Sequence, residues 1–372
     1  MGNFLSQLSS VFNFGSGKKS DSFLGIDVGS SSVKVIQLRK KRGRVVLETY
    51  GELSTGPYGG LAVGQAAVVS AEKTADLIKD LFQEANVTAR DGAFSIPLKS
   101  SLLVTIDLPE MTDKELKQAV PIEARKYVPV PISEVTLDWW PAPKRQSDDT
   151  VEESNSAHQT IDIVLAAIHK DTINRYQSIS KLTNITTDFF EIETFSTMRS
   201  SMINDLSATV IVDMGAATTK VVIVDYATVR QNHTINKGAQ DVTLAISRSL
   251  GVPFAKAEEV KRQVGLTDKE GFSGLGKTVS PVIEYIFSEV TKVMVDYQKK
   301  NNRSIERILL IGGGALLKGI DVVAKDNLYV PMEMGHPFSK VEAPAFLEPI
   351  LAEVGPSFAV SIGLALRGLQ DN

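Results

Sequence analysis

The chain has 372 residues, of which 43% are hydrophobic and 23% are charged, an ordinary balance for a globular protein of two lobes or more. Its 44 acidic and 40 basic residues give a net charge of −4, which makes no electrostatic case for nucleic acid as a main ligand. The lack of cysteine excludes disulfides and thiolate chemistry, and four scattered histidines disfavour a histidine-rich metal site. Without a membrane-length apolar run or a secretory signal, the sequence predicts a cytoplasmic protein.

Residues 1–21 predict a leader ahead of the folded body. Before glycines and lysines break the pattern, apolar side chains recur at helical spacing, at Phe4, Leu5, Leu8, Val11 and Phe12. A frayed leader or a docked helix is favoured over an amphipathic anchor for a membrane surface or a partner. The start Met1-Gly2 with Ser6 also fits the N-myristoylation pattern, which is too short to decide between them.

The segment 23–38 (FLGIDVGSSSVKVIQL) predicts a β-hairpin: a strand, a tight turn of small hydroxyl residues, and a second strand. Gly29 lets the backbone approach a ligand, and successive N–H groups in such a turn can form a nest for an anion. The serine hydroxyls add donors, and Lys34 adds positive charge. Asp27 ends the first strand, where it could face a metal ion directly or through water.

A second copy of this pattern occupies residues 210–225 (VIVDMGAATTKVVIVD). Both copies read Asp-x-Gly-x-x-x-x-Lys-Val, so that Asp27 and Lys34 match Asp213 and Lys220. The offset is 213 − 27 = 186 residues, half of the 372-residue chain. Two such hairpins half a chain apart predict a duplicated, two-lobed fold with one ligand between the lobes.

The rest of the first half predicts a mixed α/β lobe, with strands at 45–50, 91–96 and 102–108 and a helix at 69–84. Residues 109–190 predict a small α/β module inserted in this lobe. Thr112 and Glu115 form a capping box at the start of a helix that Pro121 should kink or end. There follow a strand at 135–140, a loose polar hairpin tip at 143–158, a return strand at 161–168 and a helix at 170–182.

Three aromatic residues of this module lie near prolines: Tyr127, Trp139 and Trp140. They either mark a groove for a partner or, in the case of the tryptophans, belong to the core. In the second half, a helix at 188–201 should join the lobes. Beyond the second hairpin, helices are expected at 241–250, 254–264, 280–299, 315–323 and 357–369, and a buried strand at 305–311.

Two glycine-rich stretches compete as nucleotide loops. Residues 271–278 (GFSGLGKT) match the P-loop pattern, but polar residues rather than a buried strand precede them, which favours a plain loop between two helices. Gly312-Gly313-Gly314 stands between a buried strand and a helix, where a flat or anionic ligand can approach the backbone, although the spacing is not that of a dinucleotide fingerprint. Beside two phosphate-type hairpins, contact with adenosine is the favoured interpretation.

Two Asp-x-Gly hairpins, an inter-lobe helix, a triple-glycine turn and a C-terminal helix, in this order, resemble the actin-like ATPase superfamily, which includes actin, FtsA, MreB, DnaK-type chaperones and sugar kinases. Within it, the chain resembles the PilM family of type IV pilus assembly at 108–139, 190–199 and 330–341. The resemblance implies an α/β, actin-like (ribonuclease H-like, duplicated) two-lobed ATPase fold with a small α/β subdomain inserted after the first sheet.

The resemblance divides the chain into the leader (1–21) and four subdomains. Subdomain 1A would comprise residues 22–108, 190–207 and 356–372, and the inserted subdomain 1C residues 109–189. Subdomain 2A would comprise residues 208–236 and 305–355, and subdomain 2B residues 237–304.

The resemblance also implies a site for ATP and Mg²⁺ in the cleft. Asp27 and Asp213 would hold Mg²⁺ through water. Glu193 falls where hydrolysing relatives place a water-positioning Gln or Glu, unless it is a surface carboxylate; at most a slow ATPase is expected, because hydrolysis needs in-line positioning of water. The nucleotide would contact both hairpins, one helix of subdomain 2B and the triple-glycine turn, at Gly29, Ser30, Ser31, Ser32, Lys34, Gly215, Ala216, Ala217, Thr218, Thr219, Glu258, Lys261, Gly312, Gly313, Gly314 and Lys318.

The function that the resemblance implies is an ATP-binding cytoplasmic scaffold, peripheral to the inner membrane. Subdomains 1A and 1C would form a groove for the N-terminal tail of the membrane protein PilN, within the PilN/PilO complex; self-association, and membrane contact through the leader, stay open. The alternatives are an FtsA-like cell-division protein, a type II secretion platform component, and a sugar-kinase-like phosphotransferase, for which no catalytic Asp between the lobes is evident.

Overall fold

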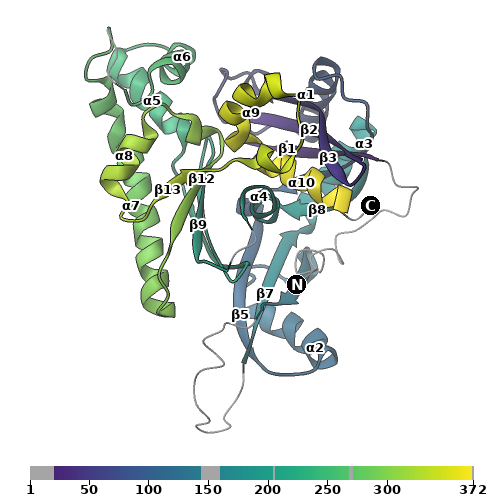
Figure 1. Ribbon diagram of the computed structural model, residues 1–372. Helices are drawn as coiled ribbons and strands as arrows, with labels where there is room; N and C mark the ends of the chain where they lie inside the picture. Colours follow the sequence, from purple (N-terminus) through teal and green to yellow (C-terminus); the bar gives the residue numbers. More distant parts are fainter. Residues whose placement is uncertain (1–20, 144–159, 204–205, 268–270, 371–372) are drawn as a thin grey trace.

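The computed structural model describes residues 21–143, 160–203, 206–267 and 271–370, which form two lobes and a small projecting sheet (Figure 1). The expected leader, apart from Asp21, lies outside the described residues. The expected hairpin tip, apart from Pro143, also lies outside them.

Each lobe is built on a five-stranded sheet, and the two sheets share one plan. The first has the order β3 (Arg44–Ser54), β2 (Ser32–Lys41), β1 (Ser22–Val28), β4 (Asp91–Ile96), β8 (Thr186–Ile192). The second has the order β11 (Thr228–Ile235), β10 (Thr219–Asp225), β9 (Thr209–Met214), β12 (Arg307–Ile311), β13 (Met332–Met334). In both, three antiparallel strands are followed by two parallel ones. This repeat confirms the duplicated two-lobed α/β fold that the paired hairpins predict.

The central strands are apolar on both faces because helices cover both faces of the first sheet. Leu24 and Ile26 of β1 pack in the cluster that holds α1 (Ala71–Glu84) and α3 (Lys170–Thr183). Phe23, on the other face, packs in the cluster of α10 (Ala359–Gln370), beside α4 (Glu193–Ser201). The helices of the second lobe are α5 (Ala239–Leu250), α6 (Phe254–Val264), α7 (Leu275–Asn301) and α8 (Ile320–Asn327).

The inserted module is an antiparallel sheet in the order β5 (Ser101–Pro109), β7 (Thr160–His169), β6 (Val135–Pro141). It lies at the bottom of Figure 1, with α2 (Asp113–Glu123) on one face in a core cluster of its own. Trp140, on the other face, packs edge-on against Phe195 of α4 with ring centroids 5.2 Å apart. Trp140 is therefore a core residue, whereas Trp139 is half-buried and Tyr127 is 40% exposed.

Several expected boundaries are wrong. Residues 188–192 end strand β8 and do not begin a helix, because Phe189, Phe190 and Ile192 are buried where β8 pairs with β4. The inter-lobe helix α4 therefore begins at Glu193. Strand β5 pairs within the small sheet and β8 within the first-lobe sheet. The expected limits of subdomain 1C, residues 109 and 189, therefore fall inside these two strands and not between the sheets.

Three helix ends also differ from expectation. Pro121 does not end α2, which runs to Glu123 and then tightens into a 3-10 turn. Helix α7 begins at Leu275 instead of residue 280, directly after Gly274 in the left-handed conformation. The helix expected from residue 315 begins only at Ile320, because Gly313–Leu316 form a 3-10 turn.

One stretch, residues 345–370, is long and apolar enough to cross a membrane by length and composition. It comprises α9 (Glu348–Val354) and α10, and 67% of its apolar window is buried inside the protein. Helix α10 packs against β1, β2, β4 and α4. The apolar character of this stretch is thus that of a core helix.

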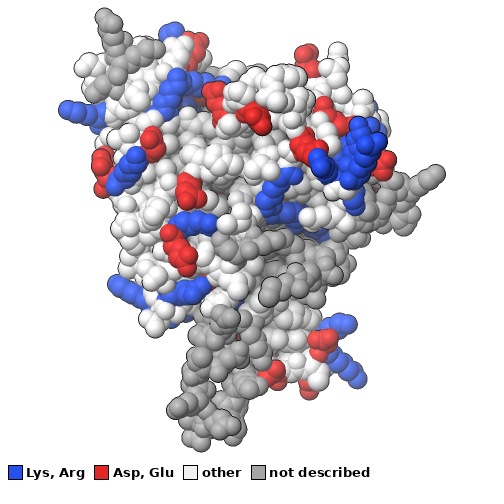
Figure 2. Space-filling view, viewed as in Figure 1, with Lys and Arg blue, Asp and Glu red and all other residues white. Residues whose placement is uncertain are grey.

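Acidic and basic side chains lie next to one another on the surface (Figure 2). Arg44 of β3 reaches Glu342 with an N–O distance of 2.7 Å, and Lys256 reaches Glu259 on α6 at 2.8 Å. Exposed pairs of this kind contribute about 0–1 kcal/mol each. The stability of the fold therefore depends mainly on its buried clusters.

Replacing Thr112 by alanine is expected to destabilise α2 by about 1 kcal/mol. The Thr112 N–H donates to Glu115 Oε2 at 2.8 Å, and the Glu115 N–H donates to Thr112 Oγ1 at 3.4 Å, which confirms the capping box. Urea unfolding followed by far-ultraviolet circular dichroism measures the change. Ser288→Ala, on the exposed face of α7, is the matched control, and an equal shift in both variants would contradict the role of the cap.

Candidate functional site

A cleft of about 400 Å³ lies between the two lobes. Every predicted site residue lines it except Ala217 and Thr219. Thr219 is fully buried, and its hydroxyl donates to the Lys237 carbonyl at 2.9 Å, so its side chain is turned away from the cleft. The two hairpins, the helix with Glu258 and Lys261, and the triple-glycine turn are thus brought together at one place, as the sequence predicts.

The two hairpin turns have the same internal geometry. The Gly29 N–H donates to the Ser32 carbonyl at 3.0 Å, and the Gly215 N–H donates to the Thr218 carbonyl at 3.0 Å. A Cβ at Gly29 would lie 2.8 Å from the Ser32 oxygen, and one at Gly215 would lie 3.0 Å from the Thr218 oxygen. Both turns therefore need glycine for the same reason, which is the close approach of the chain to itself.

Different neighbours hold the two turns. In the first, the Ala67 N–H donates to the Ser30 carbonyl and the Thr55 N–H to the Ser31 carbonyl, both at 2.9 Å. In the second, the first amides of α5 hold the turn: the Ala239 N–H donates to the Gly215 carbonyl at 2.9 Å. These contacts fix the backbone of both turns. Ser30 and Ser31 of the first turn and Ala216 and Thr218 of the second also line the cleft, where successive N–H groups of a turn can form a nest for an anion.

Lys34 and Lys220 lie at matching positions. Each is paired across its hairpin with the aspartate of the repeated pattern, Asp27 in the first hairpin and Asp213 in the second. Their side chains have different partners. Lys34 Nζ donates to Ser32 Oγ at 2.8 Å and lies 3.2 Å from Glu52 Oε1. Lys220 Nζ lies 2.7 Å from Glu193 Oε2 and 3.1 Å from Asp213 Oδ2.

The electrostatics of this centre follow from burial among opposite charges. Burial opposes the charge of Lys220, but the Asp213 and Glu193 carboxylates outweigh it and raise the pKa of Lys220. Burial raises the pKa of Asp27, opposed by Lys34 and by Ser95, whose hydroxyl donates to Asp27 Oδ1 at 2.7 Å. Lys220 is therefore a fixed cation at the floor of the cleft.

Asp27 and Asp213 suit a hydrated Mg²⁺ better than a bare one. They are the last residues but one of the central strands β1 and β9, and both line the cleft. Within the described ranges, no three or more His, Cys, Asp or Glu side chains are grouped so that they could hold a metal ion. Mg²⁺ keeps several waters and is usually bound by one or two carboxylates plus phosphate oxygens, which fits this donor set.

On the other side of the cleft, Glu258 of α6 is held by three side chains. Thr243 Oγ1 donates to it at 2.7 Å, Lys261 Nζ lies at 2.7 Å and Arg262 Nε at 2.9 Å. Burial opposes its charge, but Lys261 and the hydrogen bonds outweigh this and lower its pKa. Glu258 is therefore an ionised acceptor with a fixed orientation. Lys318 Nζ donates to the Gln263 carbonyl at 3.2 Å.

Sequence reasoning missed several residues that line the cleft. Glu52, Gly64, Arg262 and Glu353 are among them, together with Pro356, Ser357, Ala359 and Val360 ahead of and within α10. Only Glu52 had a local signal, because it lies directly across from Lys34 in the β2–β3 pairing and carries the opposite charge. The others reach the cleft through tertiary packing.

The P-loop pattern at 271–278 does not line this cleft. Its Gly276, Lys277 and Thr278 form the first turn of α7, and helix α6 is the element before it. The prediction that a buried strand does not precede it is thus confirmed for the described residues. The expectation of a loop through residue 279 is wrong, since the helix starts at Leu275.

A family model described as "Type IV pilus assembly protein PilM" matches residues 25–369. The chain belongs to the PilM family. A solved structure named "PilM-PilN type IV pilus biogenesis complex" is similar, with 26% identity, a TM-score of 0.78, and coverage of 95% of this chain and 99% of that one. The PilM resemblance that the sequence suggests is thereby confirmed.

Two further structures show that the fold is actin-like. The ethanolamine utilization protein EutJ from Carboxydothermus hydrogenoformans has a TM-score of 0.55 at 14% identity, covering 96% of this chain and 92% of its own. MreB5 of Spiroplasma citri bound to AMPPNP has a TM-score of 0.51 at 14% identity, covering 95% and 98%. The cell division protein FtsA of Streptococcus pneumoniae is 24% identical over 371 residues, covering 88% of this chain and 78% of FtsA.

Proposed function

We propose that this PilM-family protein is an ATP-binding scaffold of the type IV pilus assembly platform at the inner membrane, and that it couples nucleotide state to assembly. The observation that carries the proposal is the pair of matching hairpin turns facing one cleft, each with an aspartate and a lysine on its flanking strands. Nucleotide binding is also in keeping with the actin-like fold, since the similar MreB5 structure is described as bound to AMPPNP.

In this site the turn of Gly29 to Ser32 and the turn of Gly215 to Thr218 hold the phosphates from opposite lobes. Their N–H and hydroxyl groups donate to phosphate oxygens, and Lys34 and Lys220 supply positive charge. Asp27 and Asp213 hold water around Mg²⁺, which when bound neutralises phosphate charge. Glu258 and Lys261, which line the cleft, would face the ribose and base, and Gly312 to Gly314 with Lys318 would admit adenosine against the backbone.

The partner is proposed to be the N-terminal tail of PilN, bound in a groove between subdomains 1A and 1C. The similar solved structure is described as a complex of PilM with PilN. Half-buried Trp139 and exposed Tyr127 place aromatic surface on the inserted module for an extended peptide. The protein would then be cytoplasmic and peripheral to the inner membrane through the PilN/PilO complex, with self-association and the leader as possible additions.

Nucleotide binding tests the site directly. Asp213→Ala is expected to lower the affinity for a fluorescent ATP analogue by about tenfold, ~1.4 kcal/mol, because the water shell of Mg²⁺ loses an acceptor at the cleft. Asp27→Ala should act in the same direction. Asp321→Ala, on the exposed surface of α8, is the control. Unchanged affinity in both cleft variants would show that the site is elsewhere.

A further inference from the structure

Glu193 is the point where the nucleotide cleft and the inserted module meet. It is the first residue of α4, and it is only 7% exposed. Its two carboxylate oxygens bind different parts of the molecule. Oε2 lies 2.7 Å from Lys220 Nζ on the second hairpin, and Oε1 accepts from the Leu98 N–H at 2.7 Å.

On the cleft side, the contact depends on a cation that a ligand can compete for. Lys220 lines the cleft and its ammonium is shared between Glu193 and Asp213. A phosphate group in the cleft is a strong acceptor for the same ammonium. Nucleotide binding therefore changes how tightly Lys220 holds Glu193.

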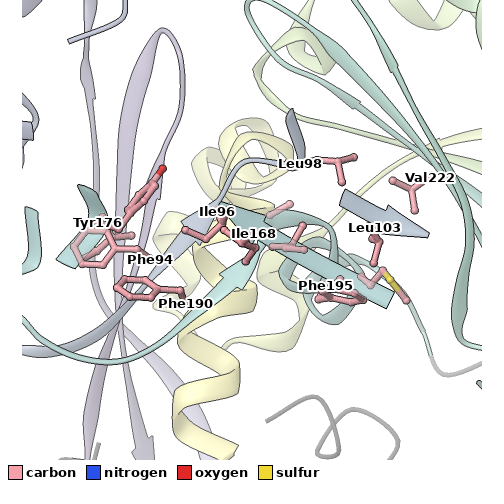
Figure 3. Packing of buried hydrophobic residues seen from close by; sticks show 14 of the residues in the cluster. Phe94, Ile96, Leu98, Leu103, Ile168, Tyr176, Phe190, Phe195 and Val222 are labelled. Atoms are coloured by element: carbon pink, nitrogen blue, oxygen red, sulfur yellow. The ribbon is translucent and has the colours of Figure 1, made fainter. Parts of the chain in front are cut away.

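On the module side, the contact sets the start of a strand. Leu98 begins the 3-10 turn Leu98–Ser100, which runs directly into β5, the edge strand of the inserted sheet. The Ser101 hydroxyl closes this turn by donating to the Leu98 carbonyl at 3.1 Å. Leu98 and Leu103 belong to one buried cluster with Val222 of β10, and Figure 3 labels all three. A displacement of the Leu98 backbone is thus passed to β5.

Strand β5 also contacts β11 of the second lobe. Thr105 Oγ1 of β5 donates to the Val229 carbonyl of β11 at 3.0 Å, and Asn232 Nδ2 of β11 donates to the Leu103 carbonyl at 2.6 Å. Strand β11 pairs with β10 next to Lys220. The inserted sheet is therefore fixed to the second lobe along β11, and Glu193 is its direct connection to a cleft-lining charge.

We propose that Glu193 is a positioning residue that couples nucleotide in the cleft to the inserted module, through Lys220 on one side and the Leu98 N–H on the other. When phosphate draws the Lys220 ammonium away, the buried carboxylate loses its counter-ion, and an uncompensated buried charge is costly. The Leu98 turn and β5 adjust, and the affinity of the module for its peptide changes. By linkage, the peptide changes nucleotide affinity by the same factor. The inference rests on the proposed function of the cleft and the module.

The variant Glu193→Gln separates the two contacts. The amide oxygen of glutamine can still accept from the Leu98 N–H, but the amide group cannot form an ion pair with Lys220. The affinity of a fluorescein-labelled peptide of the PilN N-terminal tail is measured without nucleotide and with a saturating non-hydrolysable ATP analogue and Mg²⁺. We expect a change of about fivefold or more in the wild type, within the usual range of allosteric coupling, and less than twofold in Glu193→Gln.

Two further variants make the result specific. Glu52→Gln removes another cleft carboxylate, which is paired with the lysine of the first hairpin, Lys34, and not with Lys220; it should keep the wild-type ratio of peptide affinities with and without nucleotide. Lys220→Gln breaks the same link from the cleft side. In this variant nucleotide should no longer change the peptide affinity, and nucleotide itself should bind more weakly. Melting temperatures confirm that each variant is folded.

The outcomes separate the inference from the proposed function. A wild-type ratio in Glu193→Gln, with slower ATP hydrolysis, would overturn the inference and make Glu193 a catalytic residue. Binding of both ligands to the wild type without any mutual effect would overturn the inference alone. Binding of neither ligand to the wild type would overturn the proposed function and, with it, the coupling.

Discussion

Replacing Glu191 by glutamine is expected to destabilise the first lobe by about 3–5 kcal/mol, the range for breaking a buried ion pair by removing one partner. Glu191 ends β8 inside the protein and receives both terminal nitrogens of Arg199 at 2.8 Å, one of Arg367 at 2.8 Å, and the hydroxyl of Ser196. Arg199 lies on α4 and Arg367 on α10, and both are buried. The variant would leave two buried guanidinium groups without their carboxylate.

Urea unfolding followed by tryptophan fluorescence measures this loss, because Trp140 packs against Phe195 on the same helix as Arg199. Glu306→Gln, at an exposed position before β12, is the matched control and should change the free energy of unfolding by less than about 0.5 kcal/mol. If Glu191→Gln behaved like the control, the two arginines would have to find other acceptors, and the cluster would not be what ties α4 and α10 to β8.

The same cluster predicts an acid dependence. Burial opposes the charge of Glu191, but Arg199 and Arg367 outweigh it and lower its pKa from 4.5 to about 2. A carboxylate with a depressed folded pKa stabilises the protein fully above its unfolded pKa, and this contribution is lost as the pH falls from about 4.5 to about 2. The shift corresponds to about 3 kcal/mol. Unfolding measured between pH 6 and pH 3 should show a steeper acid loss in the wild type than in Glu191→Gln.

The two-lobed fold could be predicted because its signal is repeated in the sequence. The Asp-x-Gly turn and its lysine recur with half the chain between them, and the structure turns that repeat into two sheets of one plan. Each turn is formed by residues that are close together in the sequence, so the short pattern is enough to predict it. The P-loop pattern could be rejected for a similar reason, since a working loop needs a strand before it and the neighbouring residues did not have the composition of one.

The wrong boundaries have a different origin. The helix expected to begin at residue 188 begins at Glu193, because residues 188–192 belong to strand β8. Glu191 is buried because two arginines supply its counter-ions, and one of them, Arg367, is far away in the chain. Likewise Glu193 owes its place to Lys220 and Leu98, which meet only after both lobes have folded. Local periodicity contains no information on partners of this kind.

The triple glycine offers the sharpest test of the adenosine side of the cleft, because its members do different things. Gly312 has φ 85°, and a Cβ there would lie 2.4 Å from Asp213 Oδ1 and 2.6 Å from the Met214 carbonyl. Gly313 has open space within 4 Å of a Cβ and lines the cleft. Two alanine substitutions, one residue apart, therefore separate the shape of the backbone from the room left for a ligand.

Gly312→Ala is expected to lose both stability and nucleotide affinity. A residue with a side chain is destabilised by about 1–3 kcal/mol in the positive-φ conformation of Gly312. The alanine methyl group would also displace the Asp213 carboxylate. Gly313→Ala should keep the wild-type free energy of unfolding within about 0.5 kcal/mol. It should bind a fluorescent ATP analogue about tenfold more weakly, because the methyl group occupies space proposed for adenosine. Denaturation and nucleotide titration of both variants give the answer. If Gly313→Ala bound nucleotide as tightly as the wild type, adenosine would not lie against this turn, and the cleft would hold the nucleotide by its phosphates alone.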